Sequence, residues 1–172
     1  MVLKIPSFAK TETQWPVWSG LPRPYQFDGY EGVLRIGTQD QLGSITLQPL
    51  LWNLDPLTER WGRASQTWLD VAGIDQDGFV CQLSLKKASA INVLSFIQKL
   101  QGGGVEKLDG YAVDPRACLL SLKPEGMVGA DGTPYYTLQV SDVAFVSEDH
   151  YQKAVEFIEG DQFNWVLFGE VA

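Results

Sequence analysis

Two strand-like runs joined by a tight turn constrain the fold of this chain more than any other feature. Residues 67–74 and 79–85 are rich in apolar and β-branched side chains, and Asp75-Gln76-Asp77-Gly78 stands between them. An Asp-Gly pair supplies the positive φ angles that a hairpin turn requires. The two runs therefore predict an antiparallel hairpin within a mainly β domain.

Further strand patterns lie on both sides of this hairpin. We expect strands over 33–36 and 44–51, which would form a first hairpin, and later strands over 117–122, 135–146 and 163–168. The apolar phase of the 135–146 run shifts by one residue near Ser141 and Asp142, which predicts a β-bulge there. We expect loops over 53–63 and 123–133, because proline, glycine and charged residues interrupt the apolar pattern.

Helical periodicity occurs in two places. Apolar residues spaced by three and four over 90–100 predict a helix that Ser89 caps and three glycines end. Ser147, followed by two acidic residues, predicts the start of a second helix, which ends near Gly160. The one histidine, His150, lies in the first turn of this second helix, and we expect its side chain to be solvated.

Residues 1–30 differ in character from the rest of the chain. Prolines at positions 16, 22 and 24 and glycines at 20 and 29 break any long helix or central strand. The segment is therefore expected to be an extended arm whose aromatic rings pack on the domain or mediate oligomerisation. Residues 31–172 are then expected to form a single β-barrel domain with a C-terminal helix and strand.

The order of these elements resembles the OB-fold, a partly open β-barrel of five strands with a helix between the third and fourth. Residues 79–85, 117–122 and 135–140, with the helix after Ser89, resemble the second half of single-stranded-DNA-binding barrels. There is also a faint resemblance to a cyanobacterial domain family of unknown function. The chain departs from the bacterial single-strand-binding pattern by an extra hairpin strand and a C-terminal helix. The resemblance implies an OB-fold-like barrel with two α-helices that binds single-stranded nucleic acid.

The charge of the chain limits its partners. The formal charge is −8, and residues 1–63 hold six basic and six acidic side chains, so residues 64–172 carry the whole excess. This argues against tight nonspecific binding to duplex nucleic acid or to an anionic membrane surface. Neither a targeting signal nor an apolar run of about 18 residues is evident, so we expect a cytoplasmic protein outside the membrane.

Aromatic and arginine residues cluster near the start of the chain. Five of the six tryptophans and four of the five arginines lie within residues 15–68. Flat rings beside guanidinium groups can hold unpaired bases, and each stacked base contributes about 1–3 kcal/mol. The candidate nucleic-acid-binding residues are Arg35, Arg60, Trp61 and Arg63. Trp52 and Trp68 alternate with apolar neighbours and are assigned to the core, whereas stacking and packing remain equal alternatives for Trp61.

Catalytic chemistry is easier to exclude than to assign. A single histidine leaves no His-dependent triad, and Cys81 and Cys118 lie in apolar runs typical of buried free thiols. We therefore expect no catalytic residue, metal site or cofactor. The leading hypothesis is a non-catalytic accessory protein that binds single-stranded nucleic acid. The alternative is a structural or interaction module that binds a protein partner or oligomerises through its arm, and a carboxylate-based enzyme is a weaker third possibility.

Overall fold

A computed structural model describes residues 8–9, 22–36, 40–60, 62 and 65–160 of the chain. The fold is mainly β, with two α-helices. Its elements, in chain order, are β1 (Arg23–Asp28), β2 (Val33–Ile36), β3 (Asp40–Leu42), β4 (Ile45–Thr58), β5 (Gln66–Asp75), β6 (Val80–Lys86), α1 (Lys87–Gly102), the 3₁₀ turns η1 (Glu106–Leu108) and η2 (Pro115–Ala117), β7 (Cys118–Val128), β8 (Pro134–Phe145) and α2 (Glu148–Glu159). None of the helices in these ranges has the length and apolar character needed to cross a membrane.

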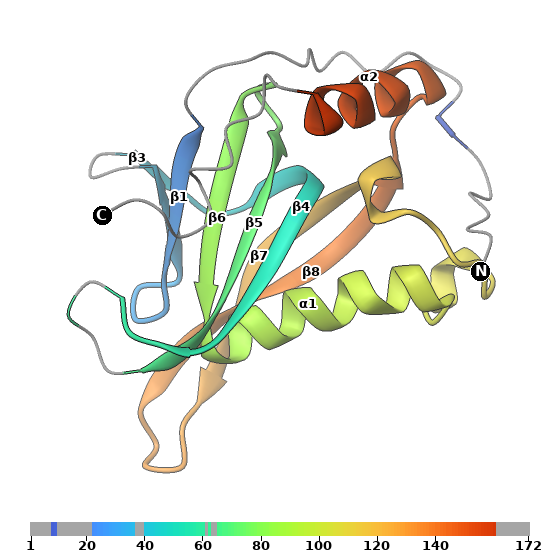
Figure 1. Cartoon of the computed structure of the whole chain (residues 1–172). Helices are drawn as coiled ribbons and strands as arrows, with labels where there is room; N and C mark the ends of the chain where they lie inside the picture. Colours follow the sequence, from blue (N-terminus) through green and yellow to red (C-terminus); the bar gives the residue numbers. More distant parts are fainter. Residues whose placement is uncertain (1–7, 10–21, 37–39, 61, 63–64, 161–172) are drawn as a thin grey trace.

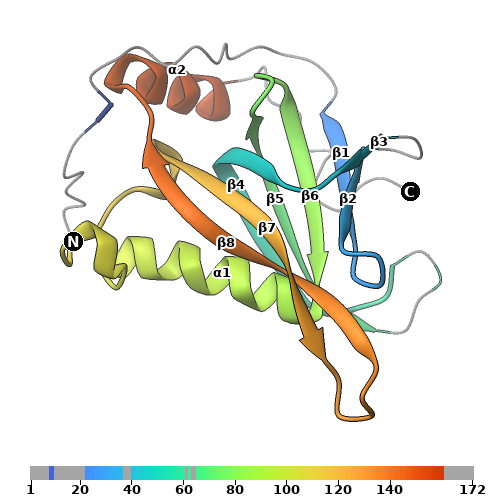
Figure 2. The same cartoon turned by 180° about the vertical axis from the view of Figure 1, so that it is seen from behind.

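The strands form one curled sheet that resembles half of a barrel (Figures 1 and 2). Their order across the sheet is β3-β2-β1-β6-β5-β4-β7-β8. The pairing is antiparallel everywhere except between β1 and β6, which run parallel. The parallel pair joins the β1–β2–β3 meander to the hairpin of β5 and β6.

The strand register sorts side chains into rows that lie on opposite faces of the sheet. One row crosses β2, β1, β6, β5 and β4 through Ile36, Tyr25, Leu83, Val71 and Trp52. All five belong to the main hydrophobic core or pack against it. Because neighbouring residues of a strand point to opposite faces, the adjacent row must face the other way. We call the side that carries the apolar row the inner face.

Each helix covers a different face of the sheet. The apolar stripe of α1 is buried with the inner face: Ala90, Val93, Ile97 and Leu100 join the main core. Helix α2 packs over the outer face near one end of β4, β5 and β6, where Ala154, Phe157 and Ile158 form a second cluster with apolar strand residues. The two helices therefore lie on opposite sides of the sheet (Figure 1).

The turn between β1 and β2 contacts β8, the edge strand on the other side of the curled sheet. The backbone N–H of Tyr136, in β8, donates to the carbonyl of Gly29, in the turn between β1 and β2, over 2.8 Å. The next outward-facing N–H of β8, that of Leu138, donates to the hydroxyl of Ser89 in α1 over 2.9 Å. These bonds occupy backbone groups of an edge strand that would otherwise be open to pairing with another chain.

Several predictions about local structure are confirmed. β5 and β6 form the expected antiparallel hairpin, and Gly78 in its turn has φ of 78°. The expected bulge is also present, because Ser121 pairs with Asp142 and Leu122 with Val140, which leaves Ser141 as the extra residue. Ser147 caps α2 by accepting a hydrogen bond from the N–H of His150, and Gly103 ends α1 with φ of 76°.

Other predictions about the strands are wrong. β4 continues to Thr58 and β7 to Val128, into segments that the sequence assigned to loops. Pairing with β5 and β8 supplies the hydrogen bonds that outweigh the weak local preference of the prolines and glycines there. The expected first hairpin is absent among the described strands, because β2 pairs with β1 and β3 instead of β4.

The start of α1 and the N-terminal arm also differ from expectation. Ser89 does not cap α1, since the capping position is Lys86 and the Ser89 hydroxyl serves β8. Of the arm, residues 23–28 are extended as expected, but they form strand β1 inside the sheet. Residues 1–7 and 10–21 of the arm and the expected strand over 163–168 lie outside the described residues.

Candidate functional site

The arginines singled out by the sequence lead to a polar row on the outer face of the sheet. The register places Arg35, Gln26, Ser84, Asp70 and Asn53 directly opposite one another across β2, β1, β6, β5 and β4. Opposed residues of paired strands project to the same face. We call this row, together with Arg60, the outer-face site. It lies beside the part of the outer face that α2 covers.

Arg60 is held at the centre of this site by a buried carboxylate. Its guanidinium donates to both oxygens of Asp70, each over 2.9 Å, and also to Asp55. The hydroxyl of Ser84 donates to the same carboxylate over 2.7 Å. The Asp70 side chain is 1% exposed and that of Arg60 13% exposed. Two-pronged hydrogen bonding of this kind fixes the guanidinium geometry, so Arg60 anchors the segment after β4 to β5.

The surroundings of Arg60 reinforce this anchoring. The hydrogen bond to Asp70 raises the pKa of Arg60 more than burial lowers it, so the guanidinium stays charged. The same group lies over the ring of Trp68, 5.1 Å from its centroid, in a cation–π arrangement. Trp68 is itself buried, as the sequence predicted. Arg60 therefore interacts on several sides with groups of its own chain.

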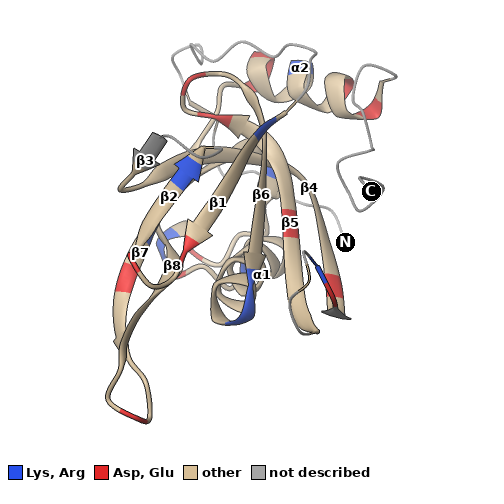
Figure 3. Cartoon of the chain, turned by 90° about the vertical axis from the view of Figure 1, so that its left-hand side faces the viewer, with Lys and Arg blue, Asp and Glu red and all other residues tan. Residues whose placement is uncertain are grey.

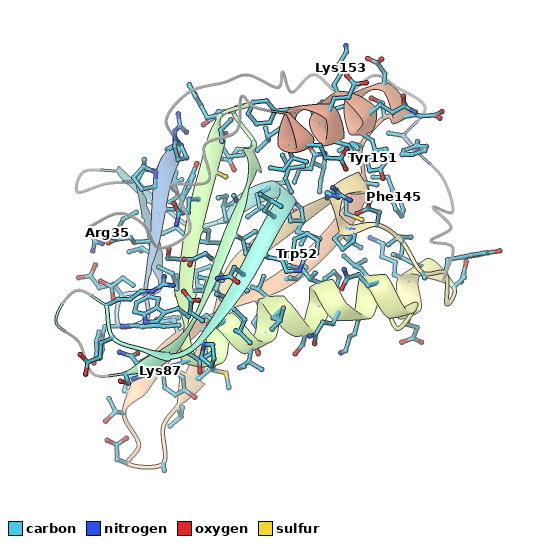
Figure 4. All side chains as sticks on the ribbon, in the orientation of Figure 1. Arg35, Trp52, Lys87, Phe145, Tyr151 and Lys153 are labelled. Carbon is cyan, nitrogen blue, oxygen red and sulfur yellow. The ribbon has the colours of Figure 1, made fainter. Side chains whose placement is uncertain are left out.

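Arg35 is also paired, although nearer to solvent. Its guanidinium donates to Glu31 over 2.5 Å and lies 3.7 Å from Asp28. Asp28 in turn accepts from the backbone N–H groups of Tyr30 and Glu31, which holds the turn between β1 and β2. Figure 4 shows Arg35 at the outer strands, on the opposite side of the molecule from Tyr151 of α2.

The structure thus brings two of the four predicted binding residues onto one face of the sheet. Arg35 and Arg60 lie on this face, separated by β1 and β6, which occupy the positions between β2 and β5. Trp61 and Arg63 lie outside the described residues. Trp52 packs partly buried against the main core, in agreement with its assignment (Figure 4).

The positive charges of Arg35 and Arg60 are neutralised within the chain. Each arginine of the pair contacts two carboxylates of its own chain. A phosphate group would have to displace these carboxylates or bind beside them, and both carry a cost in free energy. The exposed amides of Gln26 and Asn53 provide neutral hydrogen-bonding groups in the same row.

A second surface combines aromatic and apolar groups where the ends of the sheet meet. Tyr30 in the β1–β2 turn is 86% exposed, Val128 at the end of β7 is 73% exposed, and Tyr136 in β8 is 38% exposed. These residues lie far apart in sequence, and the hydrogen bond from Tyr136 to Gly29 joins the turn to the β7–β8 hairpin. We call Tyr30, Val128 and Tyr136 the tyrosine surface.

Glycines allow the Tyr136 ring to lie flat between the two elements. A Cβ on Gly32 would lie 2.7 Å from Cγ of that ring, and a Cβ on Gly126 would lie 3.7 Å from its Cε1. Gly126 is opposite Tyr136 in the β7–β8 pairing, and Val128 follows on the same face of the hairpin. The sequence pattern does not reveal this surface, because it predicts Tyr30 in the arm and Val128 in a loop. The only local signals were the two glycines, which do not reveal the contact.

A third polar group closes one end of the core beside the inner face. The Tyr25 hydroxyl donates to the buried carboxylate of Asp75 over 2.7 Å, and Arg23 contacts both Asp75 and Asp77. The Arg23 guanidinium also lies 4.0 Å from the centroid of the Phe79 ring. Asp75 additionally accepts from backbone N–H groups of the β5–β6 turn. The group joins β1 to that turn and therefore has a clear structural role.

The side chains of His150, Cys81 and Cys118 are buried in structural positions. His150 is 3% exposed, so the prediction of a solvated side chain is wrong; its Nε2 lies 2.6 Å from Oε1 of the buried Gln48. α2 turns its first residues toward β4, and the helical pattern alone could not show this. Burial raises the pKa of Cys81, and burial followed by the charge of Asp114 raises that of Cys118 to about 12. Both thiols are therefore protonated near neutral pH and poorly nucleophilic.

Across the described ranges, no three His, Cys, Asp or Glu residues are grouped so that they could hold a metal ion. Comparison with protein-family models and with curated protein sequences gave no match. The assignment of a function to this chain therefore depends on the two candidate surfaces.

Proposed function

We propose that this protein is a non-catalytic module that binds another protein. The observation that carries the proposal is the tyrosine surface, where two tyrosines and a valine are exposed together at the junction of two elements. Tyrosine provides a large contact area with little loss of side-chain entropy, and it is enriched at protein interfaces. Exposed apolar groups that lie together mark interaction sites more often than single exposed residues do.

The state of the arginines supports a protein partner over a nucleic acid. Affinity for nucleic acid depends largely on cations that neutralise phosphates. Arg35 and Arg60 are each already neutralised by two carboxylates, and the chain carries a formal charge of −8. The non-catalytic part of the proposal is supported by the protonated thiols and by the burial of His150 against Gln48.

Binding of single-stranded nucleic acid is the second candidate, together with the OB-fold-like plan from which it came. It is favoured by the polar row that crosses five strands, in which Arg35 and two exposed amides share one face. An extended strand could lie along such a row while its bases stack on nearby rings. This function would require Arg35 to exchange Glu31 for a phosphate, and the exchange would make binding strongly dependent on salt.

Site-specific photo-cross-linking would test the primary proposal. A photoreactive phenylalanine analogue would replace Tyr30 in one sample and Tyr111 in the control, since Tyr111 is also an exposed tyrosine, at the far end of α1. After irradiation in cells that express the full chain, we expect a discrete protease-sensitive adduct from position 30 and none from position 111. The proposal fails if position 30 gives no adduct, gives the same adducts as position 111, or gives adducts that nuclease removes.

Titration with a mixed-sequence single strand at low salt would test the second candidate. Binding near the tryptophans should quench their fluorescence, and the affinity should fall steeply as salt is added. From the pairing of the arginines we expect no quenching at high micromolar strand. Salt-sensitive quenching that Arg35→Ala weakens would instead establish the outer-face site as a nucleic-acid site.

A further inference from the structure

We propose that the tyrosine surface binds a basic, arginine-containing segment of a partner protein. The inference rests on the proposed function and specifies which kind of protein segment fits. It follows from the charges that surround the exposed rings, from the shape of the elements that present them, and from the poor fit of the other occupants that could cover such a surface.

The hairpin that carries half of the surface is acidic. Residues 124–137, which form the end of β7, the turn and the start of β8, include Glu125 and Asp131 but no lysine or arginine. Within the described part of the chain, neither carboxylate has an ion-pair partner. The backbone N–H of Thr133 donates to Asp131 and lowers its pKa, which keeps this carboxylate ionised near neutral pH. Figure 3 shows the acidic segments on the projecting part of the hairpin.

The turn on the other side of the surface is acidic as well. Asp28 and Glu31 flank Tyr30, and Arg35 is the one cation among the described residues that forms an ion pair with them. Lys107 donates to Asp142 and lowers its pKa, and the charge of Lys123 on β7 adds to that effect. The tyrosine surface therefore lies between two elements that each carry excess negative charge.

This combination suits a guanidinium group. Arginine can stack its planar group on a tyrosine ring while its N–H groups donate to carboxylates beside the ring. The described residues already contain this arrangement twice. Arg23 lies 4.0 Å from the Phe79 centroid and contacts Asp75 and Asp77. Arg60 lies 5.1 Å from the Trp68 centroid and contacts Asp55 and Asp70. On the tyrosine surface the rings and carboxylates are exposed, but the cation has to come from a partner.

Charge also argues against the other occupants. Nucleic acid would place phosphates against Asp28 and Glu31 and near the hairpin turn that carries Asp131, which is unfavourable. In a two-fold symmetric dimer through this surface, each acidic patch would face its own copy. The hairpin also projects beyond the body of the sheet (Figures 1 and 2), so an extended segment can reach it without a deep groove.

Peptide binding to the full chain would test this inference. The probe is a fluorescein-labelled peptide of alternating arginine and valine, and the control probe has glutamate in place of arginine. We expect the arginine peptide to bind and the glutamate peptide not to bind. Tyr30→Ser should weaken binding about two- to fivefold, which is the scale of an exposed cation–π contact, whereas the matched variant Tyr111→Ser should bind like the wild type. Circular dichroism of each variant would verify that the fold is intact.

A second pair of variants tests the charge. Glu31→Gln should weaken binding and reduce its dependence on salt, whereas Glu156→Gln, which removes the same charge from the exposed side of α2, should do neither. The inference is overturned if the arginine peptide fails to bind at high micromolar concentration, if both peptides bind equally, or if the Tyr30 and Tyr111 variants behave alike. If the peptides fail to bind as expected but cross-linking at position 30 gives a protein adduct, only the basic character of the partner is rejected. If cross-linking at position 30 gives no protein adduct, the proposed function itself is rejected.

Discussion

The outer-face site and the tyrosine surface differ in whether their side chains satisfy one another. In the first, Arg60, Asp70 and Ser84 contact each other and are largely shielded from solvent. In the second, Tyr30 and Val128 present most of their area to solvent with nothing of the described chain over them. Groups that are mutually satisfied contribute to the stability of the fold, whereas exposed apolar groups gain free energy when a partner covers them. Residue type alone does not separate these two situations.

The largest effect on stability is expected from Asp70→Ala. It leaves the shielded Arg60 guanidinium without its buried carboxylate, and removing one partner of a buried ion pair costs about 3–5 kcal/mol. Urea unfolding would measure the change in the free energy of unfolding. The double variant Arg60→Met with Asp70→Leu should recover most of the loss, because it leaves no buried charge without a partner, and Asp55, whose side chain is 33% exposed, is solvated. If Asp70→Ala lost less than about 1 kcal/mol of unfolding free energy, the outer-face site would not differ from the tyrosine surface in its contribution to stability.

A smaller loss is expected from Gly32→Ala, which disturbs the tyrosine surface. Gly32 has φ of 68°, a conformation that costs a residue with a Cβ about 1–2 kcal/mol, and its Cβ would also collide with the Tyr136 ring. Gly132→Ala is the matched control, because φ is 83° there but a Cβ would meet nothing within 4 Å. Thermal unfolding should show a greater loss for Gly32→Ala. Equal losses would mean that the ring moves aside at no cost.

Arg35→Ala should change stability less than either variant above. Its carboxylate partners are partly exposed, and ion pairs of this kind contribute about 0–1 kcal/mol. Urea unfolding of Arg35→Ala and Asp70→Ala under the same conditions would compare how much the ion pairs of Arg35 and Arg60 contribute to the free energy of unfolding. If Arg35→Ala proved as destabilising as Asp70→Ala, the outer-face site would have to be treated as one structural network from β2 to β4.

The smallest effect is expected from Asp28→Asn, and it should appear in how the free energy of unfolding changes with pH. Burial raises the pKa of Asp28, but the backbone N–H groups of Glu31 and Tyr30, with Arg35, lower it further, so the net pKa lies below its usual value. A carboxylate with a depressed folded-state pKa stabilises the fold above the unfolded-state pKa, near 4, and this contribution is lost as the pH falls through the folded-state pKa. Unfolding free energies between pH 5 and pH 2.5 should therefore fall slightly less in the variant. If the free energy of unfolding changes with pH equally in the wild type and the variant, Asp28 does not hold the turn.

Local sequence signals predicted the parts of the fold that depend on neighbours along the chain. The Asp-Gly turn before Phe79, the glycines that end α1, the Ser147 cap and the bulge at Ser141 all follow from conformational preferences within a few residues. β1 could not be recognised in this way, because its proline-containing segment becomes a strand only through pairing with β2 and β6. The same holds for the continuation of β4 past Pro49 and of β7 past Pro124.

The candidate sites were predictable to a smaller extent. The sequence pointed to Arg35 and Arg60 as neighbours of aromatic rings, and Arg60 does lie over a tryptophan, although the ring is the buried Trp68. It could not show that Asp70, ten positions further along the chain, would neutralise that arginine. The tyrosine surface required the curl of the sheet, since the β1–β2 turn that carries Tyr30 reaches Tyr136 of β8 only in the folded sheet.

The parallel pairing of β1 with β6 has a consequence for how the chain acquires its structure. Residues 23–26 pair with residues 81–84, and β2 and β3 join the sheet only through β1. During synthesis, the β1–β2–β3 meander therefore has no sheet to join until β6 has left the ribosome, whereas the hairpin of β5 and β6 can form from adjacent residues. Long-range pairing of this kind is slow compared with local pairing. The N-terminal meander is thus expected to dock late, and the tyrosine surface, which needs its turn, to be completed in the last stage of folding.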